Sequence, residues 1–283
     1  MYISVIIPTL NAGANIEQLL SMIREQDVGP SEVIIIDSSS EDKTVDIARK
    51  FHAKTIVIPG NTFNHGKTRN QAARQATGDT LVFMTQDALP VNSTLLRTLT
   101  TPLQASDIAA TFGRQIPKTD ASPLEIFVRQ FNYPDRAAVK GLSDAKQFGI
   151  KTFFLSNVCS AFKKEAFMKV GMFPENINAN EDMLITAKLL MDGYRVAYVP
   201  KAQVIHSHDL SLSKQFRRYF NIGSSLKKNN WIRTYAQPEG EGIKLVLQQV
   251  RFVAKRHEYR WIPYIFLESM TKYLGYRIGL FVG

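Results

Sequence analysis

The sequence predicts an α/β fold: a mostly parallel, Rossmann-like sheet flanked by helices and followed by a basic helical extension. Three observations support this prediction. Short runs of β-branched residues alternate with helical segments as far as Met84, each run ends in a polar cluster, and basic residues gather in the last 70 positions. Strands and helices that alternate at this spacing favour parallel strands, because each helix must cross back over one face of the sheet.

Hydrophobic periodicity places the first elements. ISVIIPTL reads as a buried strand, and the next segment has apolar residues at helical spacing, with Asn15 available as its cap. EVIIID repeats this design, so the second strand stops at Asp37. The expected strands are residues 3–10, 32–37, 55–59 and 80–84, and the expected helices are residues 16–26, 40–51 and 66–77.

Length and composition limit the class of protein. A chain of 283 residues fits one large domain, or one domain with an appendage. The single cysteine, Cys159, excludes an intramolecular disulfide, so a reducing cytosol is the expected compartment. The first residues lack the basic start of a signal peptide, and no run of about eighteen apolar residues predicts a membrane span. Whether residue 283 is the natural end is left open.

Charge is divided unevenly along the chain. Residues 1–213 hold 22 Lys and Arg against 21 Asp and Glu, whereas residues 214–283 hold 13 against 4, so the last segment carries +9 of the net charge of +10. A basic segment of this kind serves nucleic acid, an anionic membrane surface or solubility. Because no recognised nucleic-acid motif is present, a nucleic-acid partner is not expected.

Three polar clusters are expected to meet at one edge of the sheet. Pro8 to Asn11, Asp37 and Asp87 each follow a strand, and ligands of parallel sheets bind beyond the carboxyl ends of the strands. PTLNAGAN has only Gly13 where a dinucleotide site needs a Gly-rich turn, and the P-loop pattern is absent. A cation is therefore the expected partner of a nucleotide phosphate, and one strand-end carboxylate suits Mg²⁺ or Mn²⁺. The alternative for Asp87 alone is a turn or helix-capping acid.

Five segments occur in a characteristic order: VIIPTLN, VIIIDSSSEDKT, NHGKTRNQAARQATGD, TQDA and NEDMLITAKLLMDGYRVAYVP. This order resembles glycosyltransferase family 2, the inverting sugar transferases of GT-A fold, over roughly residues 1–210. The forms IDSSSED, FNHGKTRN and TQDA are most similar to bacterial rhamnosyltransferases that use dTDP-L-rhamnose. The resemblance implies a catalytic domain over residues 1–213, with a nucleotide-sugar half to about residue 112 and an acceptor half from residue 113.

The resemblance also implies a set of nucleotide-binding residues. Asp37 would hydrogen-bond the base or ribose, and Arg69 would approach the diphosphate, to which its planar guanidinium is suited. The alternatives are a turn acid for Asp37 and an exposed helix face for Arg69 and its neighbour. The full set is Pro8, Thr9, Asn11, Asp37, Arg69, Asn70 and Gln86, with His65 and Lys67 as weaker candidates.

In the metal motif, Asp87 matches the last acid of the family's Asp-x-Asp pattern, and Thr85 stands in the place of the first. This departure leaves one carboxylate to hold Mg²⁺ or Mn²⁺ together with the diphosphate. His206 in VIHSHD matches a metal-binding histidine of some family members, although a polar strand end is the alternative. For His208 the polar strand end is the preferred interpretation.

The general base is expected in NANEDMLITAKLL. The resemblance assigns this role to Asp182 in preference to Glu181; both acids also suit the first turn of a helix. Ser156 and Asn157, in FFLSNVC, fall where the family lines the acceptor pocket, and an ordinary strand end is their alternative. Residues 113–150 suit either an acceptor-side flap or a surface excursion.

The C-terminal segment contains an apolar helical stripe, Ile243, Val246, Leu247, Val250 and Val253, and a basic stripe, Lys244, Arg251 and Lys255. With Trp261 and Tyr264 as aromatic anchors, this pattern fits an interfacial helix on anionic lipid. A helical cap packed on the catalytic domain is the alternative. The resemblance implies a glycan or lipid-linked glycan acceptor and a cytoplasmic enzyme that is peripheral on the inner face of the cell membrane.

Three other functions compete with this prediction. A family 2 enzyme can use a UDP-sugar as its donor. A nucleotidyltransferase usually has a basic, Gly-rich loop after the first strand, and PTLNAGAN lacks the basic residue. A non-catalytic nucleotide-sugar binding module is suggested only by Thr85 in the metal motif.

Overall fold

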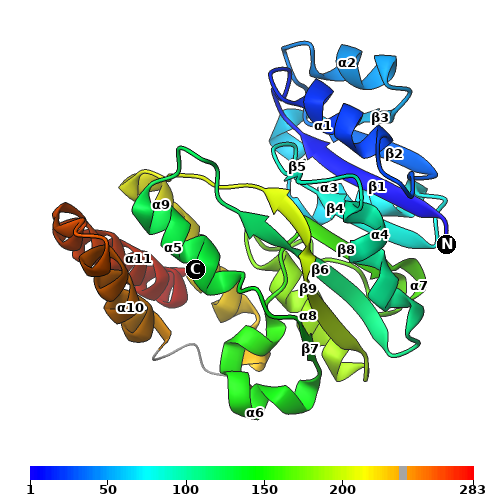
Figure 1. Ribbon diagram of the computed structural model, residues 1–283. Coiled ribbons are helices and arrows are strands. Elements are labelled where there is room, and N and C mark those ends of the chain that lie inside the picture. Colours follow the sequence, from blue (N-terminus) through cyan, green and yellow to red (C-terminus); the bar gives the residue numbers. More distant parts are fainter. Residues whose placement is uncertain (236–240) are drawn as a thin grey trace.

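The computed structural model describes residues 1–235 and 241–283 (Figure 1). The strands are β1 (Ile3–Thr9), β2 (Glu32–Asp37), β3 (Lys54–Val57), β4 (Thr80–Met84), β5 (Leu89–Pro90), β6 (Ile108–Ile116), β7 (Ala138–Lys140), β8 (Cys159–Lys163) and β9 (Arg195–Ile205). The helices are α1 (Ile16–Arg24), α2 (Thr44–Lys50), α3 (His65–Gln75), α4 (Leu95–Thr100), α5 (Pro123–Asn132), α6 (Ala145–Phe148), α7 (Lys164–Lys169), α8 (Glu181–Met191), α9 (Leu212–Lys228), α10 (Glu241–Lys255) and α11 (Ile262–Val282).

The predicted elements up to Met84 are all present, with shifted ends. The second helix begins at Thr44 rather than at residue 40, because Asp42 accepts hydrogen bonds from the backbone N–H groups of Gly13 and Thr44 and holds the preceding residues in a loop. Asn15 occupies the N-cap position of α1, but its side chain contributes no capping hydrogen bond within the described residues. The predicted side-chain cap is therefore wrong.

Within the described residues, nine strands form one sheet, in the order β3-β2-β1-β4-β8-β6-β9-β5, with β7 also paired to β9. The N-terminal strands β1 to β4 pair in parallel, as predicted. Beyond β4 the sheet is mixed, since β8 runs antiparallel to both β4 and β6, whereas β6 and β9 are parallel. The α/β class is confirmed, and the description as mostly parallel holds for the first half only.

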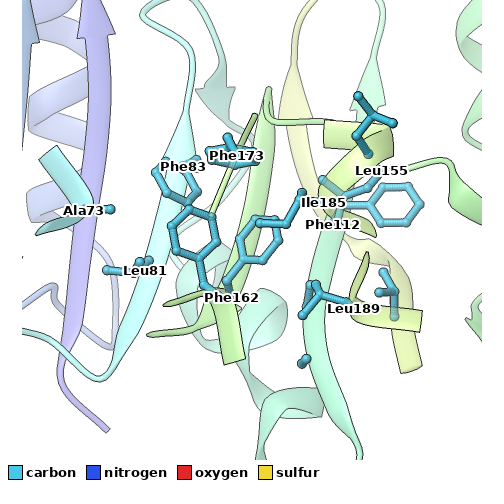
Figure 2. Close-up of a cluster of buried hydrophobic side chains, with 14 of the residues drawn as sticks. Ala73, Leu81, Phe83, Phe112, Leu155, Phe162, Phe173, Ile185 and Leu189 are labelled. Atoms are coloured by element: carbon cyan, nitrogen blue, oxygen red, sulfur yellow. The ribbon is translucent and has the colours of Figure 1, made fainter. Parts of the chain in front are cut away.

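The core lies on both faces of this sheet. Alternate residues of β4 face opposite sides: Phe83 packs with α3, α7 and α8, whereas Val82 packs with α1, α2 and α4. Figure 2 shows Phe83 beside Phe162 and Phe173 in the first of these layers, where the ring centroids of Phe83 lie 5.7 and 5.2 Å from theirs. Burial on both faces explains why these strands read as continuous apolar runs.

Residues 113–150 are not a simple excursion from the surface. Their first four residues complete the central strand β6, so the predicted division at residue 112 falls inside a strand. The register with β9 then jumps, because Gly113 pairs with Val199 but Arg114 pairs with Gln203. Such a bulge re-aims the side chains that follow it, here Gln115.

The C-terminal helices pack on each other and on α5 at one side of the molecule (Figure 1). Helix α11 lies close against α9, and a side chain on Gly275 or Gly279 would overlap the backbone of Phe216 or Phe220. The predicted domain boundary after residue 213 lies in the first turn of α9. No helix in the described part of the chain is long and apolar enough to span a bilayer.

The predicted interfacial stripe on α10 is corrected by this packing. Val253 is buried in a cluster with Leu124 of α5 and Ile265 of α11, and Val246 and Val250 pack against that cluster. Only Ile243 and Leu247 of the stripe are exposed. Trp261 and Tyr264 do not act as outward anchors either, because both line a cavity between α5, α9 and α11.

Candidate active site

The predicted polar clusters meet at one edge of the sheet. The carboxyl ends of β1, β2 and β4 lie side by side, because these strands pair in parallel. The segment before β8 reaches the same edge, since β8 is antiparallel to β4 and the Thr85 N–H donates to the Val158 carbonyl at 3.3 Å. The end of β9 is brought there by β5, which pairs Leu89 with Ile205.

The loops after β1 and β2 are joined through Asp37. Its carboxylate is fully buried and accepts hydrogen bonds from the Thr9 hydroxyl at 2.7 Å and from the Ser40 hydroxyl at 2.6 Å. Asn11 adopts a left-handed backbone with φ of 48°, and its side chain accepts a hydrogen bond from the Glu41 N–H. The structure therefore gives Asp37 a loop-fixing role, and its predicted contact with a nucleotide stays a prediction.

Gln86 joins the end of β4 to the first loop. Its side chain accepts from the Leu10 N–H at 2.8 Å and donates to the Leu10 carbonyl at 3.1 Å. These two bonds fix the loop that carries Pro8, Thr9 and Asn11 beside Asp87. The predicted nucleotide-binding residues of the strand ends are thus brought together.

Asp87, His206 and His208 form a candidate cation site, and their ligand atoms all lie within 4.8 Å of one another. The Asp87 carboxylate lies 3.5 Å from His206 Nε2 and 2.7 Å from His208 Nε2. His206 is buried, as its predicted metal role requires, whereas His208 is exposed but packs its ring edge-on against the ring of His206. His208, interpreted from the sequence as a polar strand end, thus also reaches this cluster, and a role for it in binding a cation stays a prediction.

Gln115 sets the orientation of the buried imidazole. Its Oε1 lies 3.1 Å from His206 Nδ1, and Arg129 donates to the same oxygen, so Oε1 is an acceptor and Nδ1 carries the proton. Burial lowers the pKa of His206 to about 3, which keeps the ring neutral. The lone pair of Nε2 then faces the carboxylate of Asp87.

Two acceptors that face each other at 3.5 Å are stabilised by a cation between them. Burial by itself would raise the pKa of Asp87, but the hydrogen bond from His208 helps to hold it well below its usual range. Asp87 is thus ionised, His206 presents a neutral nitrogen, and the set of one carboxylate and two imidazoles suits a divalent ion such as Mn²⁺. These residues fit the predicted metal.

Asp182 lies in a different environment, in the first turn of α8. Burial raises its pKa to about 7, and the adjacent charge of Glu181 adds to this shift. Glu181 is buried, and its Oε1 lies 3.6 Å from the guanidinium of Arg69. The N-cap of α8 is Asn180, so neither acid acts as the cap. Asp182 has the raised pKa of a general base that works near neutral pH.

The α3 residues divide into two groups. Arg69 is buried against Glu181, not on an exposed face, and its Nε has no hydrogen-bond partner in the described residues. Asn70 donates both amide hydrogens, to the Phe173 carbonyl and to Glu175, so the structure gives it a structural role. His65 and Lys67 are exposed. The predicted nucleotide contacts of these residues stay predictions.

Ser156 and Asn157 connect the two centres. Gln115 Nε2 donates to Ser156 at 2.9 Å and to the hydroxyl of Tyr133 at 2.6 Å. On the other side, the Asn157 side chain lies 3.4 Å from Glu181, and its backbone N–H donates to Asp182. The pair therefore lies between the cation site and the candidate base, and its predicted contact with an acceptor stays a prediction.

Sequence reasoning missed Gln115, Arg129 and Tyr133. These residues lie in the segment after β6 begins, and no motif marks them. For His208 a signal existed, since residues two apart at a strand end project to the same side. That spacing would have paired it with His206.

Comparison with known proteins agrees with this geometry. The model of the family described as "Glycosyl transferase family 2" matches residues 4–171. An O-antigen chain rhamnosyltransferase of Salmonella typhimurium is 39% identical over 282 residues, which cover 99% of this chain and 90% of that protein. A second O-antigen chain rhamnosyltransferase, from Salmonella anatum, is 39% identical over 98% of this chain and 88% of its own length.

Solved structures share the fold. A mannosyltransferase from Pyrobaculum calidifontis, in complex with GDP-Man and Mn²⁺, superposes with a TM-score of 0.65 over 97% of this chain and 86% of its own, at 18% identity. This likeness supports the predicted GT-A fold. The matched family and the two relatives that align over nearly their whole length establish that the chain belongs to glycosyltransferase family 2.

Proposed function

We propose that this enzyme transfers L-rhamnose from dTDP-L-rhamnose to a glycan acceptor by a metal-assisted, inverting single displacement. The observation that carries the proposal is the pair of carboxylates at one sheet edge, Asp87 with its pKa lowered and Asp182 with its pKa raised. Relatives named as O-antigen chain rhamnosyltransferases support the choice of sugar.

The residues divide the chemistry between them. The loops fixed by Asp37 and Gln86 would receive the nucleoside, and Asp87, His206 and His208 would hold Mg²⁺ or Mn²⁺. A divalent ion bound there neutralises the charge that develops on the leaving diphosphate. Asp182 would remove the proton of the acceptor hydroxyl as the oxygen attacks the anomeric carbon opposite the diphosphate. One displacement at that carbon inverts its configuration.

Donor turnover tests this proposal. The enzyme is incubated with dTDP-L-rhamnose, UDP-glucose or UDP-GlcNAc, with Mn²⁺ or with EDTA, and with lipid-linked glycan extract as the acceptor; release of nucleoside diphosphate is measured. We expect release from dTDP-L-rhamnose that requires both the cation and the acceptor. Preferred release from a UDP-sugar would overturn the donor assignment. Nucleotide binding without any turnover would favour a non-catalytic module.

We also propose that the C-terminal extension rests on an anionic membrane surface at the cytoplasmic face. The support comes from α11 rather than α10, because one face of α11 exposes Phe266, Met270, Tyr273 and Phe281, with exposed fractions of 57, 56, 60 and 82%. Large apolar side chains exposed together on one helix face are unusual on a protein that stays in water. Exposed basic side chains such as Arg277, on α11 itself, suit anionic headgroups.

Vesicle binding tests the membrane proposal. The double substitution Phe266→Ser and Phe281→Ser should reduce co-sedimentation with phosphatidylglycerol vesicles, and phosphatidylcholine vesicles should bind less of the wild-type enzyme. The matched control replaces Tyr2 and Val57, which are exposed on the catalytic domain by 69 and 53%. Equal vesicle binding by both double variants would contradict the proposal.

A further inference from the structure

A cavity of about 560 Å³ lies between the catalytic domain and the C-terminal helices. Its walls come from α5, the segment after β9, α9 and α11, and it reaches His208 of the cation site. The volume is within the range of small-molecule sites. Among its lining residues, the site described above includes only Arg129, Tyr133 and His208.

Two buried polar atoms of the cavity lining lack partners. Glu268 is 7% exposed; its Oε1 binds Gln215 and Lys272, but its Oε2 has no hydrogen-bond partner in the described part of the chain. Trp261 Nε1 is likewise buried without a partner among the described residues. One is an acceptor and the other a donor. An unsatisfied buried polar atom is costly, so both favour a polar ligand that supplies the missing bonds.

The chemistry of the walls favours an uncharged ligand. Three basic side chains (Arg129, Arg218 and Lys272) are balanced by three carboxylates (Glu125, Asp209 and Glu268) among the lining residues. Five aromatic rings also face the cavity: Tyr133, Phe154, Tyr219, Trp261 and Tyr264. Sugar rings present apolar C–H faces to such rings and hydroxyl groups to the polar atoms between them.

We propose that this cavity binds one or more sugar residues of the acceptor glycan, and that Glu268 and Trp261 in its wall turn the unpartnered Oε2 and Nε1 atoms toward the sugar. The proposal rests on the function proposed above, because it gives the acceptor a path to the base. The hydroxyl of Tyr133 is hydrogen-bonded to Gln115, which also bonds Ser156, and the charge of Asp182 acts on Tyr133. A glycan seated in the cavity therefore extends toward the edge where Asp182 lies.

The C-terminal helices thereby take part in acceptor recognition. Trp261 and Glu268 lie on either side of the start of α11, and the close approach of α11 to α9 at Gly275 and Gly279 fixes the position of both helices. On this basis, the extension determines which glycan the enzyme accepts.

Saccharide binding to the full-length enzyme tests the proposal. Saturation-transfer NMR is recorded with the methyl glycosides of D-galactose, D-mannose, D-glucose and L-rhamnose, in the presence of Mg²⁺ and saturating dTDP so that the nucleotide site is filled. The variants are Glu268→Gln and Trp261→Phe, which retain the shape of the side chain or the aromatic ring. The matched controls are Glu17→Gln on the exposed face of α1 and Trp231→Phe, a partly buried residue that packs against the main core.

We expect at least one glycoside to bind, and each cavity variant to weaken that binding about tenfold, whereas the controls retain it. Glycoside binding that is unchanged in either cavity variant would overturn the proposal. The proposal would also be overturned if no glycoside binds and the cavity instead binds farnesyl diphosphate, used as a probe for a lipid diphosphate. The Kd of dTDP, measured in the same samples, reports separately on the proposed donor site. If the wild-type enzyme does not bind dTDP, the result counts against the donor assignment and not against the proposed role of the cavity.

Discussion

Asp87 and Asp182 lie at the same edge of one sheet, yet their surroundings shift their pKa values in opposite directions. Asp87 follows β4 and receives a hydrogen bond from His208, and its pKa is lowered. Asp182 lies in the first turn of α8 beside a second carboxylate, and burial raises its pKa to about 7. One acid is thus kept charged, whereas the other exchanges a proton near neutral pH.

This contrast shows that environment, and not residue type, separates the cation ligand from the base. The difference between the two pKa values comes from the residues that surround each carboxylate. Two histidines and a strand-end loop surround Asp87, whereas Asp182 has Glu181 as its neighbour and Arg69 farther away. Substitutions that exchange or remove these partners should therefore change the properties of one carboxylate without changing those of the other.

The largest expected effect is at the base. Asp182→Asn removes the proton acceptor, so kcat should fall by about 10²–10⁴-fold. Because Asn keeps the shape of the side chain, the affinity for Mn²⁺ with dTDP should stay within about twofold of the wild type. Steady-state kinetics and calorimetry measure the two quantities. A variant that loses Mn²⁺ affinity instead would place Asp182 in the cation site.

A smaller loss is expected at the cation site. Asp87→Asn removes the only carboxylate of the three candidate ligands, so it should lower kcat/KM by about 10²–10³-fold and weaken Mn²⁺ binding. Electron paramagnetic resonance of Mn²⁺ reports the binding directly. Asp42→Asn is a matched control on the neighbouring loop. Mn²⁺ affinity that is unchanged in Asp87→Asn would contradict the assignment.

Gln115 should act on the cation through His206. Gln115→Ala removes the acceptor for Nδ1–H, and loss of such a partner typically costs 10–100-fold in metal affinity, so we expect about that loss. Gln26→Ala is the control: Gln26 is another buried glutamine, hydrogen-bonded to Met22, Asn92 and Leu96, and its loss should lower thermal stability without changing Mn²⁺ affinity. Equal effects of both variants on Mn²⁺ would remove Gln115 from the site.

The smallest effect concerns pH. Asp182 must be ionised to accept a proton, so kcat/KM should fall as pH drops below about 7 and level off above it. Glu181→Gln removes a negative charge that raises the pKa of Asp182, so the midpoint should move to lower pH. Glu175→Gln, whose side chain pairs with Arg74, should leave the midpoint unchanged. A midpoint that moves upward in Glu181→Gln would contradict the proposed coupling.

The first half of the fold was predictable because β1, β2 and β4 are buried on both faces and alternate with helices. These features depend on neighbours in sequence. The mixed second half was not predictable, since the position of β8 between β4 and β6 depends on pairing across more than 45 residues. The bulge after Gly113 has no local signal either.

The candidate site likewise contains residues whose positions were predictable from the sequence and residues whose positions were not. Strand-end residues such as Asp37 and Asp87 were placed correctly at one edge, because parallel strands bring their carboxyl ends together. Gln115, Tyr133 and the Glu268 cavity depend on contacts between distant segments, and no spacing reveals them. The sequence of α10 fits either a lipid-facing helix or a packed helical cap, because periodicity identifies an apolar face but not what covers it.

The most direct test of the contrast between the two acids is a ¹³C NMR titration of the enzyme labelled at the aspartate carboxyl carbons. Spectra of Asp87→Asn and Asp182→Asn assign the two signals. We predict that Asp182 titrates near pH 7 and that Asp87 stays ionised to the lowest pH at which the protein remains folded. Titration of both carboxyls near the ordinary value of about 3.9, or in the reverse order, would contradict the division of roles.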